Sequence, residues 1–272
     1  MELCTKNKFI IIVIFILLII SLIYLYLLLN EKNIDVEVYI GKIYINTDKL
    51  KKNYKYFINE NYNIIKNDNI IYIENFLTPD FFNHIQNIFI NKQYSTNDNY
   101  FRKGNGVSFI NLHKDIKYND LLSLYYSEEL SLIINKIFNK YLQRLSLNDK
   151  NACSLLIYTN KGDYIDWHYD ISNLYGKRYT VLLTLVNKNN DTNELSENEF
   201  IYKVNNVEHK MKCKENSLVL FEGNNILHKS TPINNNEKRI ILSMVFCDIC
   251  QENSNLLLKI YDKVKDKTVY KN

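Results

Sequence analysis

The hydrophobic pattern of the chain changes at about residue 152, and this change restricts the folds that it can adopt. Before that point, residues 116–145 repeat apolar side chains at helical spacing. After it come five short runs rich in β-branched and aromatic residues, separated by polar segments: ACSLLIYT, RYTVLLTLV, EFIYKV, SLVLF and RIILSMVF. Helices followed by antiparallel strands predict a mainly β fold with flanking helices, a jelly roll braced by N-terminal helices.

The start of the predicted domain is marked by a strand and a helix signal. Residues 70–76, IIYIENF, read as a strand, and Thr78-Pro79-Asp80 offers an N-cap residue, a proline at the first helical position and an acid in the first turn. We therefore expect a helix over FFNHIQNIFI and a folded domain over residues 70–250. A polar stem at 30–69 precedes this domain, and a tail or last helix at 251–272 follows it.

A long apolar segment lies near the N-terminus, after a short tail at residues 1–8. Residues 9–29 carry no charge, and as a helix they would be about 31 Å long, enough to cross the hydrocarbon core of a bilayer. A cleavable signal peptide would have a shorter apolar region and a small-x-small cleavage site, and this segment has neither. The sequence therefore predicts a single transmembrane signal-anchor helix.

The orientation of the predicted anchor follows from a small charge bias. Lys6 and Lys8 precede the segment, whereas acidic residues are mixed with Lys32 after it. The bias favours a type II membrane protein with its domain in the lumen of the endoplasmic reticulum or another secretory membrane. A cytosolic domain is the alternative. A glycosylation sequon at Asn190-Asp191-Thr192 fits a lumenal domain.

The charge of the chain gives no sign of nucleic-acid binding. The formal net charge is only +4, and the lysines and arginines are spread along the sequence instead of forming a stripe. We expect no nucleic-acid partner.

The cysteines do not decide whether the domain lies in an oxidising or a reducing compartment. Cys247 and Cys250 form a CxxC motif, but no second pair and no nearby histidine completes a zinc site. A disulfide and two reduced cysteines at the end of a strand are both compatible with the motif. Cys153 lies in an apolar run and is expected to be a buried thiol.

Two histidines lie in settings that suit a metal ion. His168 and Asp170 are two residues apart in an extended segment, so their side chains lie on the same face. His228 follows a hydrophobic strand and a Gly-Asn turn. Two imidazoles and one carboxylate leave open positions for a cosubstrate and dioxygen, the arrangement typical of non-haem Fe(II). The rival third ligand, His209, lies in a charged alternation that reads as an exposed edge strand.

The other two histidines, His84 and His113, are expected to be ordinary surface residues. Trp167 is expected to pack on the outer face of the strand that carries His168 and not to bind substrate.

An arginine eleven residues after His228 is a candidate anion anchor. Arg239 opens the strand RIILSMVF, where a guanidinium facing the metal can bind a carboxylate in a bidentate manner. Ser243 would share its inward face by strand alternation. A surface salt bridge of Arg239 with Glu237 or Glu222 is the alternative interpretation.

With these segments in place, residues 70–248 resemble the 2-oxoglutarate/Fe(II)-dependent dioxygenases, and among them the prolyl 4-hydroxylase-like branch. The matching segments occur in the order of the family: IENFLTPDFFNHI, IYTNKGDYIDWHYD, RYTVLLTLVN, NSLVLFEGNNILHKSTPI and EKRIILSMVF. The resemblance implies a double-stranded β-helix core with iron held by His168, Asp170 and His228. It also implies that Arg239 binds 2-oxoglutarate and that Tyr158 lines the cosubstrate pocket, although Tyr158 could equally be a core residue.

The sequence departs from the family at three places. Thr184 or Leu185 stands where many members have a tyrosine that contacts 2-oxoglutarate. Residues 195–199, LSENE, replace a Gly-Gly-Glu turn. The spacing from His228 to Arg239 is one or two residues longer than usual. None of these changes removes a predicted ligand, but they leave the substrate class open.

The resemblance implies hydroxylation coupled to the decarboxylation of 2-oxoglutarate to succinate, with Fe(II), 2-oxoglutarate and O2 as the reacting groups and ascorbate as a candidate reductant. The expected substrate is a prolyl or other residue of a protein or peptide. Small molecules, lipids and nucleic acids are the other substrate classes of such oxygenases. A membrane-tethered binding protein that keeps the fold without turnover is the alternative from a different class.

Overall fold

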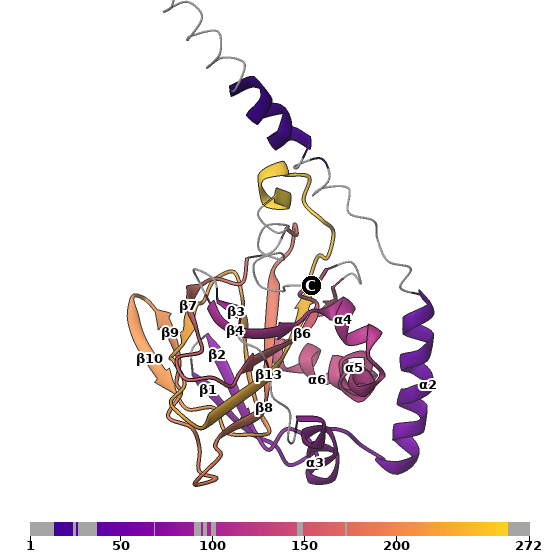
Figure 1. The fold of residues 1–272 in the computed structure, drawn as a ribbon. Coiled ribbons are helices and arrows are strands. Elements are labelled where there is room, and N and C mark those ends of the chain that lie inside the picture. The colour runs from indigo at the N-terminus through magenta and orange to yellow at the C-terminus, as the bar shows by residue number, and fades with distance from the viewer. Residues whose placement is uncertain are drawn as a thin grey trace, which may run out of the picture.

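The structure is a computed structural model, and it describes residues 14–23, 26, 37–67, 69–89, 94, 97–98, 102–145, 149–171 and 173–260. Within these residues, strands and helices form a β-sheet structure with a helical layer on one side (Figure 1).

The described residues contain thirteen strands, and every neighbouring pair is antiparallel. Eleven of them follow one path in the order β1-β2-β11-β8-β13-β6-β4-β7-β12-β9-β10. Their bounds are β1 Asn63–Asn67, β2 Ile70–Glu74, β3 Asn97–Asp98, β4 Arg102–Val107, β5 Gln143–Arg144, β6 Cys153–Tyr158, β7 Tyr164–His168, β8 Arg178–Asn189, β9 Phe200–Val204, β10 Val207–Met211, β11 Ser217–Glu222, β12 Leu227–Ser230 and β13 Glu237–Cys247.

The path divides into two parts at β4. This strand pairs with β6 on one side and with β7 on the other. We call the strands from β1 to β6 along the path the major sheet, and β7, β12, β9 and β10 the minor sheet. The five strand runs predicted after residue 152 are confirmed as β6, β8, β9, β11 and β13.

Helices cover the outer face of the major sheet. They are α3 Pro79–Gln86, α4 Phe109–Lys114, α5 Asn119–Tyr126 and α6 Glu128–Phe138, with short 3-10 turns at Asn87–Phe89 and Ile116–Tyr118. A further helix, α2 Glu37–Asn53, packs on α5 at the outside of this layer (Figure 1). Their apolar faces share one buried cluster with alternate residues of the sheet, among them Leu121, Ile134, Leu183 and Leu242. The predicted helical regions are therefore confirmed, and burial of their apolar stripes fixes them on the sheet.

The start of α3 differs in one detail from the sequence prediction. Pro79 and Asp80 occupy the first turn as expected, but Thr78 makes no side-chain cap to the helix. Its hydroxyl instead donates to the carbonyl of Tyr56. The residue thus ties the chain before the domain to α3.

A second apolar cluster lies on the inner face of the major sheet, toward the minor sheet. It includes Leu182 and Ile241 from the major sheet and Phe200, Tyr202 and Ile226 from the minor sheet or the turn before β12. The space between the sheets is therefore filled in this region, as expected of a jelly roll.

Part of the expected stem contributes to the main core. Ile43 and Leu50 of α2 are buried, as are Phe57 and Ile58 after it. Asn46 of α2 also donates to Asp120 and Ser123 of α5. Residues 37–67 therefore pack on the helices and the sheet.

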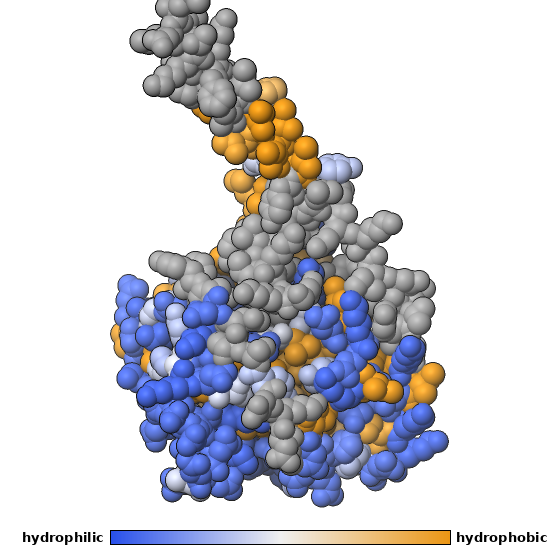
Figure 2. All heavy atoms as spheres, in the orientation of Figure 1, coloured by the Kyte–Doolittle hydropathy of each residue, from blue (hydrophilic) through white to orange (hydrophobic). Residues whose placement is uncertain are grey.

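The predicted membrane span at residues 9–29 lies partly outside the described residues. Residues 14–23 are helical with exposed apolar side chains, which appear as an orange rod above a largely blue domain surface (Figure 2). Within the part of the chain that the structure describes, no helix is long and apolar enough to cross a membrane. Of the predicted tail, residues 256–260 are helical, and 261–272 lie outside the described residues.

One histidine differs from its sequence interpretation. We expected His113 at the surface, but its side chain is buried beside Phe109, with the ring centroids 4.7 Å apart. Burial lowers the pKa of His113 to about 4. The ring is therefore a neutral core group at neutral pH, and the earlier interpretation was wrong.

Candidate metal centre

The two predicted histidine ligands meet across neighbouring strands of the minor sheet. His168 ends β7, His228 lies in β12, and the two residues are direct cross-strand partners. Their ring centroids are 4.1 Å apart. Asp170 follows two residues after His168, and its backbone N–H donates to the carbonyl of Gly223, which holds the chain beside the sheet.

Potential ligand atoms of these three residues lie within 4.8 Å of one another. The Nε2 atom of His168 is 3.6 Å from Oδ1 of Asp170. The structure thus brings together His168, Asp170 and His228 as predicted, and among the described residues this is the group with the geometry for a metal ion.

Backbone carbonyls fix which nitrogen of each imidazole is available. Nδ1 of His168 lies 2.7 Å from the carbonyl of Asp166, and Nδ1 of His228 lies 3.0 Å from that of Ile226. A carbonyl only accepts, so each Nδ1 must carry the proton and donate. With Nδ1 used in this way, Nε2 is the nitrogen of each ring that can offer a lone pair to a metal.

Asp170 is held in its charged form. Burial by itself raises the pKa of Asp170, but electrostatic interactions with His228, Arg178 and His168 and a hydrogen bond from Thr180 together outweigh it and hold the pKa below its usual range. Thr180 Oγ1 donates to Oδ2 at 2.6 Å. The bond occupies one oxygen of the carboxylate and leaves Oδ1 facing the histidines.

His228 is deprotonated at neutral pH. Its pKa is lowered to about 4, chiefly by burial, with a further contribution from His168. Its side chain is almost fully buried, whereas His168 and Asp170 are 26% and 18% exposed. The group is therefore closed on the His228 side and open to solvent on the other, which suits a ligand that enters from outside.

Gly223 allows the close packing around Asp170. A Cβ atom at this position would lie 2.8 Å from both Cβ of Asp170 and Oγ1 of Thr180. Such distances are shorter than van der Waals contact, so a side chain here would displace the carboxylate or its hydrogen-bond donor. The glycine that we interpreted from sequence as part of a turn is also a packing requirement of the site.

Arg239 is a buried cation without an acidic partner in the described structure. It is 3% exposed, and its Nε is buried with no hydrogen-bond acceptor. Burial lowers its pKa from the ordinary value. The expected alternative, a salt bridge with Glu237 or Glu222, is not formed. Glu222 pairs with Lys177, and Glu237 accepts from backbone N–H groups.

Ser230 connects Arg239 to the metal group. Its hydroxyl accepts from Nη1 of Arg239 and donates to Asn198. Ser230 lies two residues after His228 in β12, so both side chains point to the same inner face. The guanidinium is therefore held on the same side of the minor sheet as His228.

Tyr158 lies beside Arg239. The two residues are cross-strand partners, and the guanidinium carbon is 5.7 Å from the ring centroid. The tyrosine hydroxyl is buried without a hydrogen-bond partner among the described residues. Gly104 of β4 gives the ring room, because a Cβ there would lie 3.0 Å from it. The buried guanidinium of Arg239 and the buried hydroxyl of Tyr158 therefore lie side by side as polar groups inside the fold.

The remaining predicted positions fall where alternation places them. Ser243 is buried and shares the inner face of β13 with Arg239. At the place of the tyrosine found in many family members, Leu185 belongs to the helix-side core, so Thr184 is the inward residue. In the altered turn at 195–199, Asn198 binds Thr231 and Ser230, so this turn supports the serine that contacts Arg239.

Four residues of the site were not found from sequence: Thr180, Gly223 in its packing role, Ser230 and Arg178. Arg178 is 5% exposed, its Nε has no acceptor in the described structure, and its charge lowers the pKa of Asp170. A signal was available for it, since Arg178 opens the strand RYTVLLTLV as Arg239 opens RIILSMVF. The contacts of Thr180 and Ser230 depend on cross-strand register, which one sequence does not reveal.

The other histidines lie outside the group. His209 stacks on Tyr202 in the edge hairpin, with ring centroids 5.2 Å apart. His84 binds Asp120 on the helical layer. Trp167 points to the outer face, as expected from alternation, where Lys203 and Lys229 lie 4.5 and 4.6 Å from its ring centroid.

Comparison with known proteins identifies the fold. A scan against protein-family models and a search of curated proteins found no match. Among solved structures, the non-haem α-ketoglutarate-dependent epimerase SnoN from nogalamycin biosynthesis matches 75% of this chain and 83% of its own, with 9% identity and a TM-score of 0.50. A prolyl 4-hydroxylase from Pseudomonas putida matches 66% of this chain and 92% of its own, with 15% identity and a TM-score of 0.44. HygX from Streptomyces hygroscopicus, solved with nickel and 2-oxoglutarate, matches 66% of this chain and 82% of its own, with 11% identity and a TM-score of 0.45.

The chain therefore has the jelly-roll fold of 2-oxoglutarate/Fe(II) oxygenases, as its sequence resemblance implied. The assignment of the fold rests on the first of these matches, because the other two are weaker. At such low identity the likeness concerns the fold, whereas the chemistry depends on the residues of the site.

Proposed function

We propose that this protein is a membrane-anchored dioxygenase that uses Fe(II) and 2-oxoglutarate to hydroxylate a prolyl or other residue of a protein. The observation that supports it best is the pairing of two features on one inner surface. Three potential ligand atoms lie within 4.8 Å of one another, and a buried guanidinium without an acidic partner in the described residues faces the same inner surface. Both features fit a dicarboxylate. One end of it can chelate the metal, and its other end needs a cation.

The residues present fit the metal and the cosubstrate. His168 and His228 offer Nε2 lone pairs, and Asp170 offers a charged oxygen. Two neutral imidazoles and one carboxylate suit Fe(II) with open positions. Bound together, iron, 2-oxoglutarate and dioxygen supply the oxidation, with succinate and CO2 as the coproducts.

The contribution of the chain is to bind and orient. Arg239 and Tyr158 offer a cation and a hydroxyl to the far carboxylate of the cosubstrate, and Ser230 holds the guanidinium in place. The cluster around Leu182, Phe200 and Ile241 excludes water from the interior. Such preorganisation supports the reaction because no solvent has to be rearranged as charge develops.

A peptide is the substrate class that we favour. The open side of the site lies at His168 and Asp170, so a long substrate can approach without entering the barrel. A secretory-membrane anchor with a lumenal domain would place the site beside newly made chains. The choice of proline comes from the sequence resemblance to prolyl 4-hydroxylases, and ascorbate is proposed only as a reductant that keeps the iron ferrous.

The activity is tested with the full-length protein in detergent, loaded anaerobically with Fe(II) and 2-oxoglutarate. We expect a weak visible charge-transfer band and, after oxygen is admitted, slow succinate formation without substrate. His168→Ala should abolish both, whereas His209→Ala, a histidine outside the group, should retain them. Binding of Fe(II) and 2-oxoglutarate without any succinate would instead indicate a membrane-tethered binding protein.

The substrate is tested by a separate measurement. Incubation of the same protein with a peptide library that contains proline should yield products heavier by the mass of one oxygen atom. Succinate formation that no peptide stimulates would contradict the peptide assignment and leave small molecules and lipids to be examined.

A further inference from the structure

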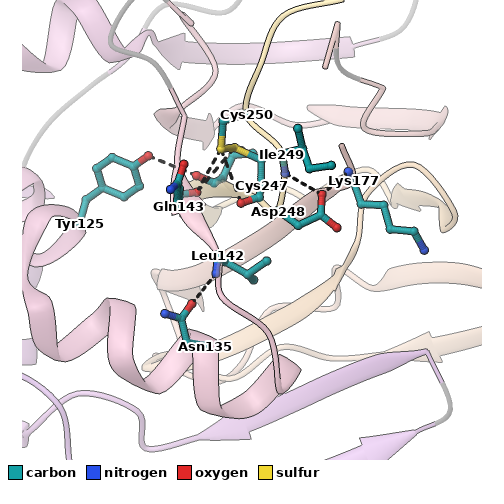
Figure 3. The surroundings of a disulfide bond; sticks show 10 residues. Tyr125, Asn135, Leu142, Gln143, Lys177, Cys247, Asp248, Ile249 and Cys250 are labelled. Atoms are coloured by element: carbon teal, nitrogen blue, oxygen red, sulfur yellow. Dashed lines mark hydrogen bonds between the residues drawn. A yellow bond between two sulfur atoms is a disulfide. The ribbon is translucent and has the colours of Figure 1, made fainter. Parts of the chain in front are cut away.

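The CxxC motif forms a disulfide beside the loop that leads away from the metal group. Cys247 is the last residue of β13, and it is bonded to Cys250 three residues later (Figure 3). Cys247 is fully buried, whereas Cys250 is only partly buried. Cys250 is therefore the half of the bond that lies closer to solvent.

The segment that the disulfide anchors supports residues 175–177. Three consecutive backbone N–H groups donate to it: that of Tyr175 to the carbonyl of Gln251, that of Gly176 to the carbonyl of Ile249 and that of Lys177 to Oδ1 of Asp248. Packing is so close that a Cβ atom on Gly176 would lie 2.4 Å from Oδ1 of Asp248. The position of this loop therefore depends on where residues 248–251 are held.

A loop of this size is a weak structural cross-link. The bond closes a ring of only four residues, and a disulfide stabilises a fold chiefly when it closes a long loop. The surroundings also suit the reduced form. The carbonyl of Gln143 is 3.6 Å from the sulfur of Cys247 and 3.9 Å from that of Cys250, so after reduction it can accept from either thiol (Figure 3).

We propose that Cys247–Cys250 is a thiol–disulfide exchange site for a small thiol of the glutathione type, and that its reduction loosens residues 175–177. The thiolate of the reagent attacks Sγ of Cys250, the S–S bond breaks, and Cys247 leaves as a thiolate that takes up a proton. A second thiol attacks the mixed disulfide and releases Cys250. The protein gains two electrons and two protons, and the reagent becomes its disulfide.

The exchange has a route to the candidate metal centre. Residues 171–177 join Asp170 to Arg178, and Thr180, which binds Asp170, follows directly. A loop that moves more freely there holds Asp170 less firmly. This last step rests on the proposed function, whereas the exchange and the loosening of the loop stand apart from it.

The exchange is tested on the full-length protein equilibrated with mixtures of reduced and oxidised glutathione. Free thiols are alkylated and counted by mass spectrometry, and amide hydrogen exchange is followed at residues 173–177. We expect reversible reduction of this pair while the protein stays folded, together with about tenfold faster exchange at 175–177. Cys250→Ser, which cannot form the bond, should show the same fast amide exchange without added glutathione.

The control is Cys213→Ser, which changes a buried free cysteine outside the pair and should leave the titration and the loop unchanged. The proposal is overturned if the pair stays oxidised at a millimolar excess of reduced glutathione. It is equally overturned if amide hydrogen exchange at 175–177 stays unchanged after the pair has been reduced. The same holds if Cys250→Ser folds and its amide exchange at 175–177 equals that of the unchanged protein. Neither readout uses oxygenase activity, so failure here is distinguishable from failure of the proposed function.

Discussion

Thr180 illustrates how much a single hydroxyl can contribute to a candidate metal ligand. It donates to Oδ2 of Asp170 from a fully buried position, so it both orients the carboxylate and favours its charged form. Thr180→Val keeps the shape of the side chain and removes this bond. We expect Fe(II) or Co(II) affinity to fall about ten- to a hundredfold, measured by titration of the full-length protein.

The matched control for Thr180 lies on the same strand. Thr184 is buried as well but does not contact Asp170 in the described hydrogen bonds, so Thr184→Val should leave metal affinity unchanged. Equal losses in the two variants would show that the effect comes from the sheet and not from the ligand.

Arg239 should act on the cosubstrate and not on the metal. Arg239→Gln removes the buried charge but retains an amide that can reach Ser230. We expect the affinity for 2-oxoglutarate to fall about ten- to a hundredfold, the usual loss for a charge-assisted pair. Metal affinity should not change, and the two can be separated by titrating each ligand in turn. A variant that loses metal affinity to the same extent would contradict the assignment.

At the scale of the elements, burial decided what the sequence could predict. The strands of the major sheet are buried on both faces or alternate clearly, so β6, β8, β11 and β13 appear as apolar runs. β4, RKGNGV, and β12, LHKS, carry no such pattern, because they are half-exposed and contain few apolar side chains. The strand that joins the two sheets was therefore missed, although three ligand positions were found from residue type and spacing.

Helix α2 is the element whose role the sequence least revealed. Its composition is polar, and we interpreted its residues as a stem, but Leu50 is 6% exposed and lies in the main core. We expect Leu50→Ala to lower the free energy of unfolding by about 2–4 kcal/mol. Ile45→Ala, on the exposed face of the same helix, should change it by less than about 0.5 kcal/mol. Denaturant unfolding of both variants measures the difference.

At the scale of the whole molecule, the predicted anchor and the domain are close in the sequence. Only seven residues, 30–36, separate the predicted span from α2, and a chain of that length reaches at most about 25 Å. If residues 9–29 cross a bilayer, the domain therefore works next to the membrane. The side on which it works decides which proteins it can meet.

Glycosylation of Asn190 would show on which side of the membrane the domain lies. This residue lies exposed in the turn after β8 and begins the sequon Asn190-Asp191-Thr192. A glycosyltransferase in the lumen could therefore reach it. We expect the protein made in cells to carry a glycan that an endoglycosidase removes, and Thr192→Ala, which keeps Asn190 but destroys the sequon, to migrate like the deglycosylated form. A membrane-bound chain that carries no glycan and is digested by protease added to the cytosolic side would reverse the predicted orientation. The proposed peptide substrates would then have to be sought among cytosolic proteins, because only those could reach His168 and Asp170 on the open side of the site.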